Sequence, residues 1–163
     1  MLKDIIMALL YHFFLLIISM IMMILFMNLF KSLILVSIIK LLVILFVITL
    51  YFWTGGKLDI KKSTKLDFLT VSSITIIGFI LWLICLIYTG DGIFSTITEK
   101  TSSYWGLSNI FNFPSIIVTS ICFNYTLDTP FKNLLMIFPP SIIMYIAMKF
   151  KRILLSKKHD ERV

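Results

Sequence analysis

Long apolar stretches, separated by short basic segments, constrain the fold of this chain more than any other feature. Residues 5–53 contain four strongly polar side chains, and further apolar runs cover residues 68–88 and 131–150. Sixty per cent of the residues are hydrophobic and 14% are charged, whereas soluble domains are about 45–50% apolar and about 25% charged. A soluble core of 163 residues cannot bury that much apolar surface. The sequence therefore predicts an all-α integral membrane protein.

The lengths of the apolar runs predict four transmembrane helices in a single polytopic domain, residues 1–163. A helix needs about 20 residues to cross the bilayer, so the first run holds two helices with a turn at Asn28 and Lys31. The expected order is a helix at 5–27, a helix at 33–53, a polar loop at 54–67, a helix at 68–88, an outer region at 89–130, a helix at 131–150 and a basic tail at 151–163.

A shorter apolar segment lies at residues 114–127 in the outer region. As a helix it would extend about 21 Å, less than the roughly 30 Å thickness of the hydrocarbon core. Asn112 followed by Pro114 suits a helix start, because proline fits the first turn. We expect a short interfacial or re-entrant helix between the third and fourth spans, and its length alone leaves open whether it lies on, dips into or crosses the membrane.

The basic residues predict the orientation of the chain. Positively charged loops remain in the cytoplasm, and four spans put eleven of the fifteen Lys and Arg residues on one side, whereas a fifth span would move the basic tail outwards. Both termini are therefore expected on the cytoplasmic side of the membrane. A bacterial cell membrane is expected because the bias towards Ile, Lys and Asn over Ala is typical of AT-rich bacterial genomes. We expect the basic residues behind the net charge of +7 to contact anionic headgroups of the lipid bilayer, and we expect no nucleic-acid partner.

Two ionisable residues within the predicted spans are candidate functional residues. Lys40 lies about seven residues inside the second helix, where its side chain either extends to the headgroups or pairs with a substrate or partner. No Asp or Glu lies in a predicted span to pair with it. His12 is either a proton switch or a hydrogen-bonded packing residue.

Three further candidates lie near the middle of the last predicted span and in the loop before it. Pro139 and Pro140 predict a kink or break in the fourth helix, because they remove two backbone donors. Asp128 reads as part of a turn or cap before that helix, or with Asp91 and Glu99 as a site for a cation or basic peptide.

Small and polar residues at helical spacing in the third helix predict a packing face, namely Thr75, Gly78, Trp82 and Cys85. Cys85 and Cys122 lack metal-ligand spacing, and we expect them to be packing residues.

Motifs of known membrane enzymes and exporters are missing from the chain. There is no Gly-x-Ser-x-Gly, no P-loop, no Asp pair like that of lipoprotein signal peptidases, and no first-span Glu like that of four-helix multidrug exporters. The sequence thus predicts a non-enzymatic protein without a cofactor. We expect an accessory, regulatory or immunity-type protein that contacts another membrane protein, or a second copy of itself, through its helices. A small oligomeric transporter or channel is the alternative, and a phage-type holin is a further one.

Overall fold

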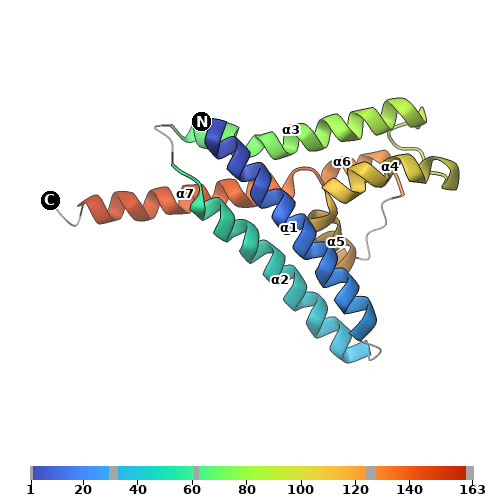
Figure 1. Ribbon diagram of the computed structural model, residues 1–163, viewed down its shortest axis with the longest axis horizontal. Coiled ribbons are helices and arrows are strands. Elements are labelled where there is room, and N and C mark those ends of the chain that lie inside the picture. The colour runs from blue at the N-terminus through green and yellow to red at the C-terminus, as the bar shows by residue number, and fades with distance from the viewer. Residues whose placement is uncertain (1, 30–32, 61–62, 124–127, 161–163) are drawn as a thin grey trace.

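The computed structural model is a set of helices joined by short connections (Figure 1). It describes the backbone of residues 2–29, 33–60, 63–123 and 128–160, and the side chains of residues 2–25, 41–60, 63–119 and 128–157. All regular secondary structure in these ranges is helical, so the all-α prediction is confirmed there. The helices are α1 (Leu2–Leu29), α2 (Leu33–Lys57), α3 (Thr64–Thr89), α4 (Glu99–Phe111), α5 (Phe113–Phe123), α6 (Pro130–Leu135) and α7 (Pro139–Asp160).

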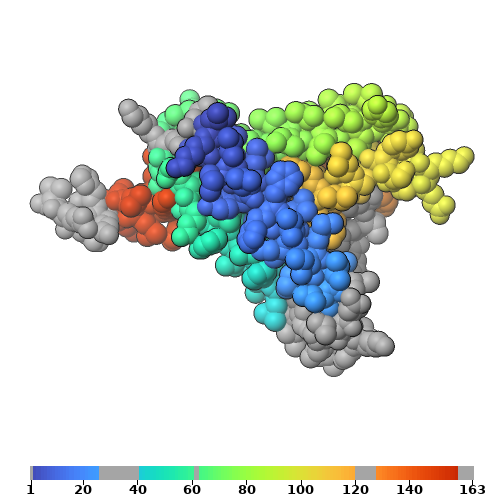
Figure 2. Space-filling model, in the orientation of Figure 1, coloured from blue at the N-terminus to red at the C-terminus, as the bar shows by residue number. Residues whose placement is uncertain are grey.

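Two helix pairs form the framework of the molecule. α1 packs on α2, and α7 packs on both α3 and α2. The pairs meet at the end that carries both chain termini and diverge towards the opposite end, where α4, α5 and α6 lie between them (Figure 1). The space-filling view shows α1 crossing one face of this assembly, between α2 and α3–α4 (Figure 2).

Three helices are long and apolar enough to cross a membrane: Leu2–Leu25, Thr64–Thr89 and Pro130–Lys157, the last of which combines α6 and α7. The described side chains of α2 add a shorter apolar stretch, Leu41–Lys57. Large apolar side chains remain exposed on the outer faces of these helices, for example Phe13, Phe14, Ile17, Ile80 and Leu83. Exposed apolar surface of this extent marks contact with lipid or protein. These lengths and surfaces are those of a membrane protein.

The connection between α2 and α3 is shorter than the predicted loop at residues 54–67. α2 continues to Lys57, and α3 already begins at Thr64. Gly55 lies inside α2 because the backbone of α7 passes close to it: a Cβ atom at this position would be 2.6 Å from the Met144 carbonyl oxygen. Gly55, which falls within the predicted loop, thus belongs to a helix–helix contact.

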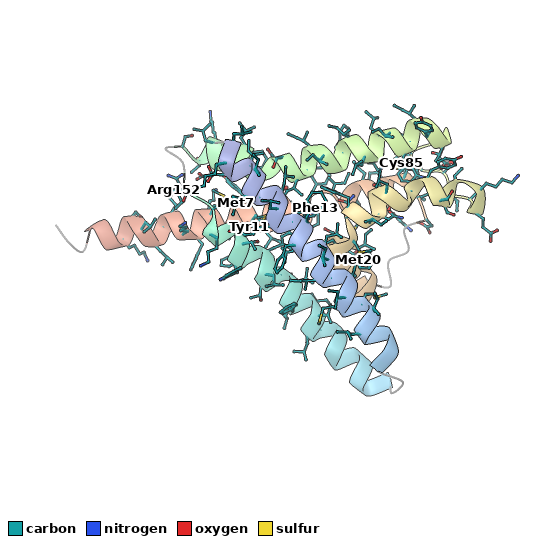
Figure 3. All side chains as sticks on the ribbon, viewed as in Figure 1. Met7, Tyr11, Phe13, Met20, Cys85 and Arg152 are labelled. Atoms are coloured by element: carbon teal, nitrogen blue, oxygen red, sulfur yellow. The ribbon has the colours of Figure 1, made fainter. Side chains whose placement is uncertain are left out.

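The last predicted span is divided at the proline pair, as expected. α6 ends at Leu135 and α7 begins at Pro139. α7 then continues through the segment expected as a tail, as far as Asp160. Two contacts hold this extension: Lys151 Nζ donates to the Leu58 carbonyl oxygen at 2.8 Å, and Arg152 pairs with buried Asp67 at the start of α3 (Figure 3).

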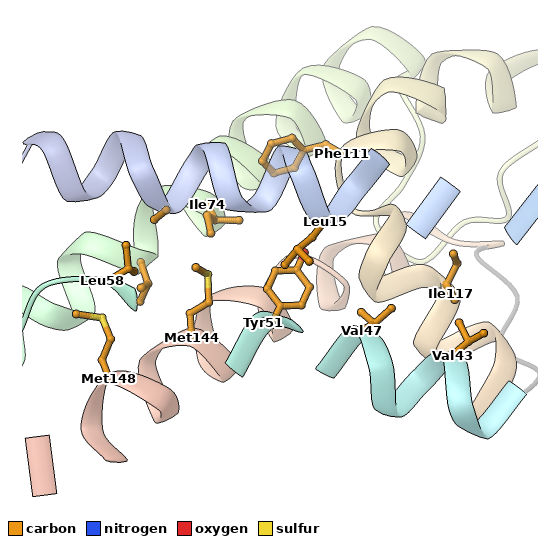
Figure 4. Packing of buried hydrophobic residues seen from close by; sticks show 12 residues of the cluster. Leu15, Val43, Val47, Tyr51, Leu58, Ile74, Phe111, Ile117, Met144 and Met148 are labelled. Carbon is orange, nitrogen blue, oxygen red and sulfur yellow. The ribbon is translucent and has the colours of Figure 1, made fainter. Parts of the chain in front are cut away.

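The core lies where the helix pairs meet and consists of aliphatic, Met and aromatic side chains (Figure 4). The packing face predicted on α3 is confirmed: Gly78, Trp82 and Cys85 are buried. Thr75 donates a hydrogen bond to Ser141 of α7 at 2.8 Å, and the Ser141 hydroxyl donates to the Val71 carbonyl oxygen at 2.8 Å. α3 and α7 are therefore joined by hydrogen bonds as well as by packing.

Candidate functional site

The bend between α4 and α5 is held by hydrogen bonds between buried polar groups. Asn112 is the residue between the two helices and is 2% exposed. Its backbone N–H and its side-chain amide both donate to the Ser108 carbonyl oxygen, at 3.0 and 2.9 Å. Its own carbonyl oxygen accepts hydrogen bonds from the N–H groups of Ser115 and Ile116, at 3.0 and 3.1 Å. One residue therefore ends α4 and begins α5.

His12 binds the last carbonyl of α4. Its Nε2 atom is 3.0 Å from the Phe111 carbonyl oxygen, and its Nδ1 atom is 2.8 Å from the Tyr51 hydroxyl. A carbonyl oxygen only accepts, so Nε2 carries the hydrogen, and in the neutral ring the Tyr51 hydroxyl donates to Nδ1. The final carbonyls of a helix have no partner within that helix. His12 supplies the missing donor from α1, and Tyr51 holds the ring from α2.

Aromatic and hydroxyl contacts fix this arrangement further. The His12 ring lies 4.6 Å from the Phe111 ring, and the Phe13 ring lies edge-on to Phe111 at 6.0 Å. Thr54 donates to the Tyr51 carbonyl oxygen at 3.1 Å. His12 is 0% exposed and Tyr51 is 1% exposed. The sequence interpretation of His12 as a hydrogen-bonded packing residue describes these contacts.

α3 also approaches the bend closely. A Cβ atom on Gly78 would lie 2.8 Å from the side chain of Ile137 and 3.3 Å from the Asn112 side-chain oxygen. The bend therefore contacts the middle of α3 as well as the middle of α1. Only a residue without a side chain leaves room for both the bend and α6–α7 at this point.

Pro139 and Pro140 lie near the start of α5, just after the bend. Both line a cavity of about 80 Å³ between α2, α5 and the start of α7. Tyr51, the partner of His12, also lines it, and so do Pro114 and Ser115 from the first turn of α5. The Ser115 Oγ atom is buried and has no hydrogen-bond partner among the described residues. Lys40 belongs to α2, but its side chain lies outside the described residues.

Asp128 makes two contacts within the segment between α3 and α7. Its carboxylate pairs with Lys132 at 2.6 Å, and its carbonyl oxygen accepts the Ile97 N–H at 2.7 Å. Thr129 then caps α6 by accepting from the Lys132 N–H. The residues that the structure describes contain no cluster of three His, Cys, Asp or Glu side chains able to hold a metal ion.

Two tryptophans hold the same region against α3 and the preceding loop. The Trp82 indole N–H donates to the Pro130 carbonyl oxygen at 2.7 Å, and that of Trp105 donates to the Asp91 carboxylate at 3.2 Å. Cys85 is free and buried, and its Sγ atom is 3.1 Å from the Tyr104 carbonyl oxygen (Figure 3).

Sequence reasoning missed the partners of these residues. Tyr51 and Asp67 were not singled out, and Asn112 was considered only as a helix start. The position of Asp67 could have predicted its cationic partner. It lies in the first turn of a long apolar helix, and a carboxylate is buried there only when a cation pairs with it. No local signal pointed to Tyr51, which is 39 residues away from His12.

Comparison with other proteins leaves the site without a described counterpart: no protein-family model, curated protein or solved structure matches this chain.

Proposed function

We propose that this chain is a small non-enzymatic accessory protein of the bacterial cytoplasmic membrane. It acts by contacting another membrane protein through its helices, as a regulatory subunit or as an immunity factor against a membrane-active peptide. The observation that carries this proposal is the use of the interior polar groups. His12, Tyr51 and the Phe111 carbonyl bond to one another, and Thr75 and Ser141 join α3 to α7. These groups hold helices together, which leaves the exposed apolar faces for lipid or a partner.

In this proposal α1, α2, α3 and α6–α7 cross the membrane, with both termini in the cytoplasm. α2 has 25 helical residues, which is long enough to span. The basic residues support the orientation, since Lys3, Lys57 and Lys65 lie at the start of α1, the end of α2 and the start of α3. Lys151 of α7 lies beside them, because its Nζ atom donates to the Leu58 carbonyl oxygen just after α2.

The α4–α5 pair is then a re-entrant hairpin that enters from the outer side and turns at mid-membrane. Non-helical backbone is tolerated at that depth only where protein satisfies its polar groups. Asn112 and His12 provide such hydrogen bonds at the bend. The contacts of the bend with the middle of α1 and of α3 support this depth.

The test is purification in mild detergent after crosslinking in cells, followed by identification of the crosslinked partner. We expect one membrane protein to be enriched by a photo-crosslinker at lipid-facing Leu83 and to be lost when the neighbouring Phe79 and Ile80 are both changed to Ala. Specific solute flux or substrate turnover by the purified protein alone in liposomes would contradict an accessory role.

A small oligomeric transporter or channel is the second candidate, favoured by one feature. The break between α6 and α7 faces the short helix α5 across a cavity, and broken helices near the midplane often form transport sites. The liposome measurement separates the two proposals, because a transporter moves solute without a second protein.

A further inference from the structure

A groove of about 140 Å³ lies where the start of α1 meets the end of α2. It combines charged and apolar side chains, and the residues that line it are Lys3, Asp4, Met7, Tyr11, Lys57, Leu58 and Asp59. We propose that this groove binds the phosphoethanolamine headgroup of a zwitterionic phospholipid. The inference goes beyond the accessory function and does not depend on which protein the chain contacts.

The two lysines of the groove are available to bind a phosphate. Lys3 and Lys57 are exposed, and neither forms an ion pair with a carboxylate in the part of the chain that the structure describes. The Lys57 Nζ atom lies 5.1 Å from the centre of the Trp53 ring. This contact holds the ammonium group beside the groove and leaves its hydrogen-bond donors for a ligand oxygen. Phosphate oxygens accept strong, charge-assisted hydrogen bonds from such donors.

Two carboxylates in the same groove determine which phosphate ligand fits. Asp4 is 5% exposed and Asp59 is exposed. Two lysines and two aspartates leave the described lining without net charge. A purely anionic headgroup would lie close to both carboxylates without compensation, whereas the ammonium group of ethanolamine pairs with Asp59. The lining therefore selects a ligand that carries both charges.

The groove changes from charged to apolar along α1. Lys3, Met7 and Tyr11 are four residues apart, so they lie on one face of the helix and extend over about 12 Å of its axis. Figure 3 shows Met7 and Tyr11 following one another along α1. The neighbouring Ile6 and Leu10 are 48% and 55% exposed. A lipid whose headgroup occupies the charged end therefore places its acyl chains on apolar surface, which free phosphoethanolamine cannot use.

The size and position of the groove also fit a headgroup. Benzene occupies a cavity of about 150 Å³, so a volume of about 140 Å³ accommodates the slightly smaller phosphate group. The ammonium group then lies at the open rim, where Asp59 is exposed. Tyr and Trp side chains are typical of the headgroup level of a bilayer, and Tyr11 lines the groove while Trp53 holds Lys57.

The experiment measures lipid binding to the full, delipidated chain in detergent by native mass spectrometry. Phosphatidylethanolamine and phosphatidylglycerol with identical acyl chains are compared, and we expect phosphatidylethanolamine to bind about fivefold more tightly. Lys57→Gln should weaken this binding about fivefold through loss of one charged contact. The control is Lys149→Gln. Lys149 is also exposed and lies 5.3 Å from the Tyr145 ring centre, but it does not line the groove.

Asp59→Asn tests the ammonium contact separately. Loss of this carboxylate removes both the attraction for ethanolamine and the repulsion of an anionic headgroup. The variant should therefore bind phosphatidylglycerol as tightly as phosphatidylethanolamine. Glu99→Gln is the control, because Glu99 is exposed at the start of α4 and should leave the preference unchanged.

Three outcomes would overturn the proposal. Equal effects of Lys57→Gln and Lys149→Gln would show that the groove is not the site. Equal or tighter binding of phosphatidylglycerol by the unchanged chain would exclude a zwitterionic ligand. Soluble phosphoethanolamine, added in about tenfold excess, should leave the lipid bound, and its displacement of the lipid would overturn the membrane as the source of the ligand.

Discussion

His12 accepts one hydrogen bond and donates another in the interior of the molecule. The Nε2 hydrogen satisfies the last carbonyl of α4, while Nδ1 accepts from Tyr51. Without this donor the Phe111 carbonyl oxygen would be buried with no helical partner. The imidazole therefore links α1, α2 and α4 at one point, and these hydrogen bonds stabilise the bend between α4 and α5.

Tyr51→Phe tests this link, because it removes the hydroxyl and keeps the ring. The free energy of unfolding should fall by about 1 kcal/mol, the range of hydrogen bonds between membrane helices. The measurement is reversible unfolding in mixed micelles, with Tyr88→Phe as the control, since Tyr88 is 76% exposed. In a double-mutant cycle with His12→Ala, most of that loss should disappear. Equal effects of the two Tyr→Phe changes would argue against the link.

Asp67 and Arg152 form an ion pair between α3 and α7. The Asp67 side chain is 1% exposed, and that of Arg152 is 31% exposed. Removing one partner of a buried pair leaves a charge with poorer compensation. Asp67→Asn should lower the free energy of unfolding by about 2 kcal/mol, less than for a fully buried pair because Arg152 is partly solvated.

The control for Asp67→Asn is Asp59→Asn, at an exposed position in the loop after α2. Both variants lose one negative charge, so a difference between their unfolding midpoints reports the buried contact. If the two midpoints shift equally, the pair contributes nothing beyond net charge.

Among the helices, α2 and α7 approach each other closely at Gly55, and this glycine determines how near their backbones can come. A Cβ atom at Gly55 would be 2.6 Å from the Met144 carbonyl oxygen and 2.7 Å from its Cα atom. Backbone atoms cannot adopt another rotamer as a side chain can. A side chain at position 55 would therefore push α2 and α7 apart. Gly56, the next residue, has no atom within 4 Å of its Cβ position.

Gly55→Ala should therefore destabilise the protein by about 1–3 kcal/mol through overpacking. Gly56→Ala should be neutral or stabilising by up to about 1 kcal/mol, because alanine is the better helix former. Thermal unfolding in detergent, followed by circular dichroism, compares the two variants directly. Similar melting temperatures for both would refute the close approach of α7 to α2.

Across the whole molecule, basic residues gather where the start of α1, the end of α2 and the start of α3 lie beside the middle of α7 (Figure 1). The extension of α7 beyond the core carries Lys151 and Arg152, which fold back onto Leu58 and Asp67. Anionic headgroups at the cytoplasmic surface attract such residues by about 1 kcal/mol each. The orientation proposed for the chain follows from this concentration of charge.

Cysteine labelling tests the topology. In a background with Cys85 and Cys122 replaced by Ala, Ser95→Cys should react with a membrane-impermeant maleimide in intact cells. Ser156→Cys and Asp59→Cys should react only after permeabilisation. Labelling of Ser156→Cys but not of Asp59→Cys in intact cells would put these two residues on opposite sides of the membrane and contradict the four-span proposal. Labelling of both would invert the orientation.

The helical class, the long apolar helices and the break at Pro139-Pro140 follow from the amino-acid sequence alone. These features depend on local quantities: the transfer of successive side chains into lipid, and the missing N–H groups of proline. Residue contacts depend instead on how far each helix is rotated and shifted against its neighbours, and composition does not encode that. Only the tertiary structure therefore paired His12 with Tyr51 and the Phe111 carbonyl, moved Gly55 from a loop into a helix contact, and opened the Ser115 cavity.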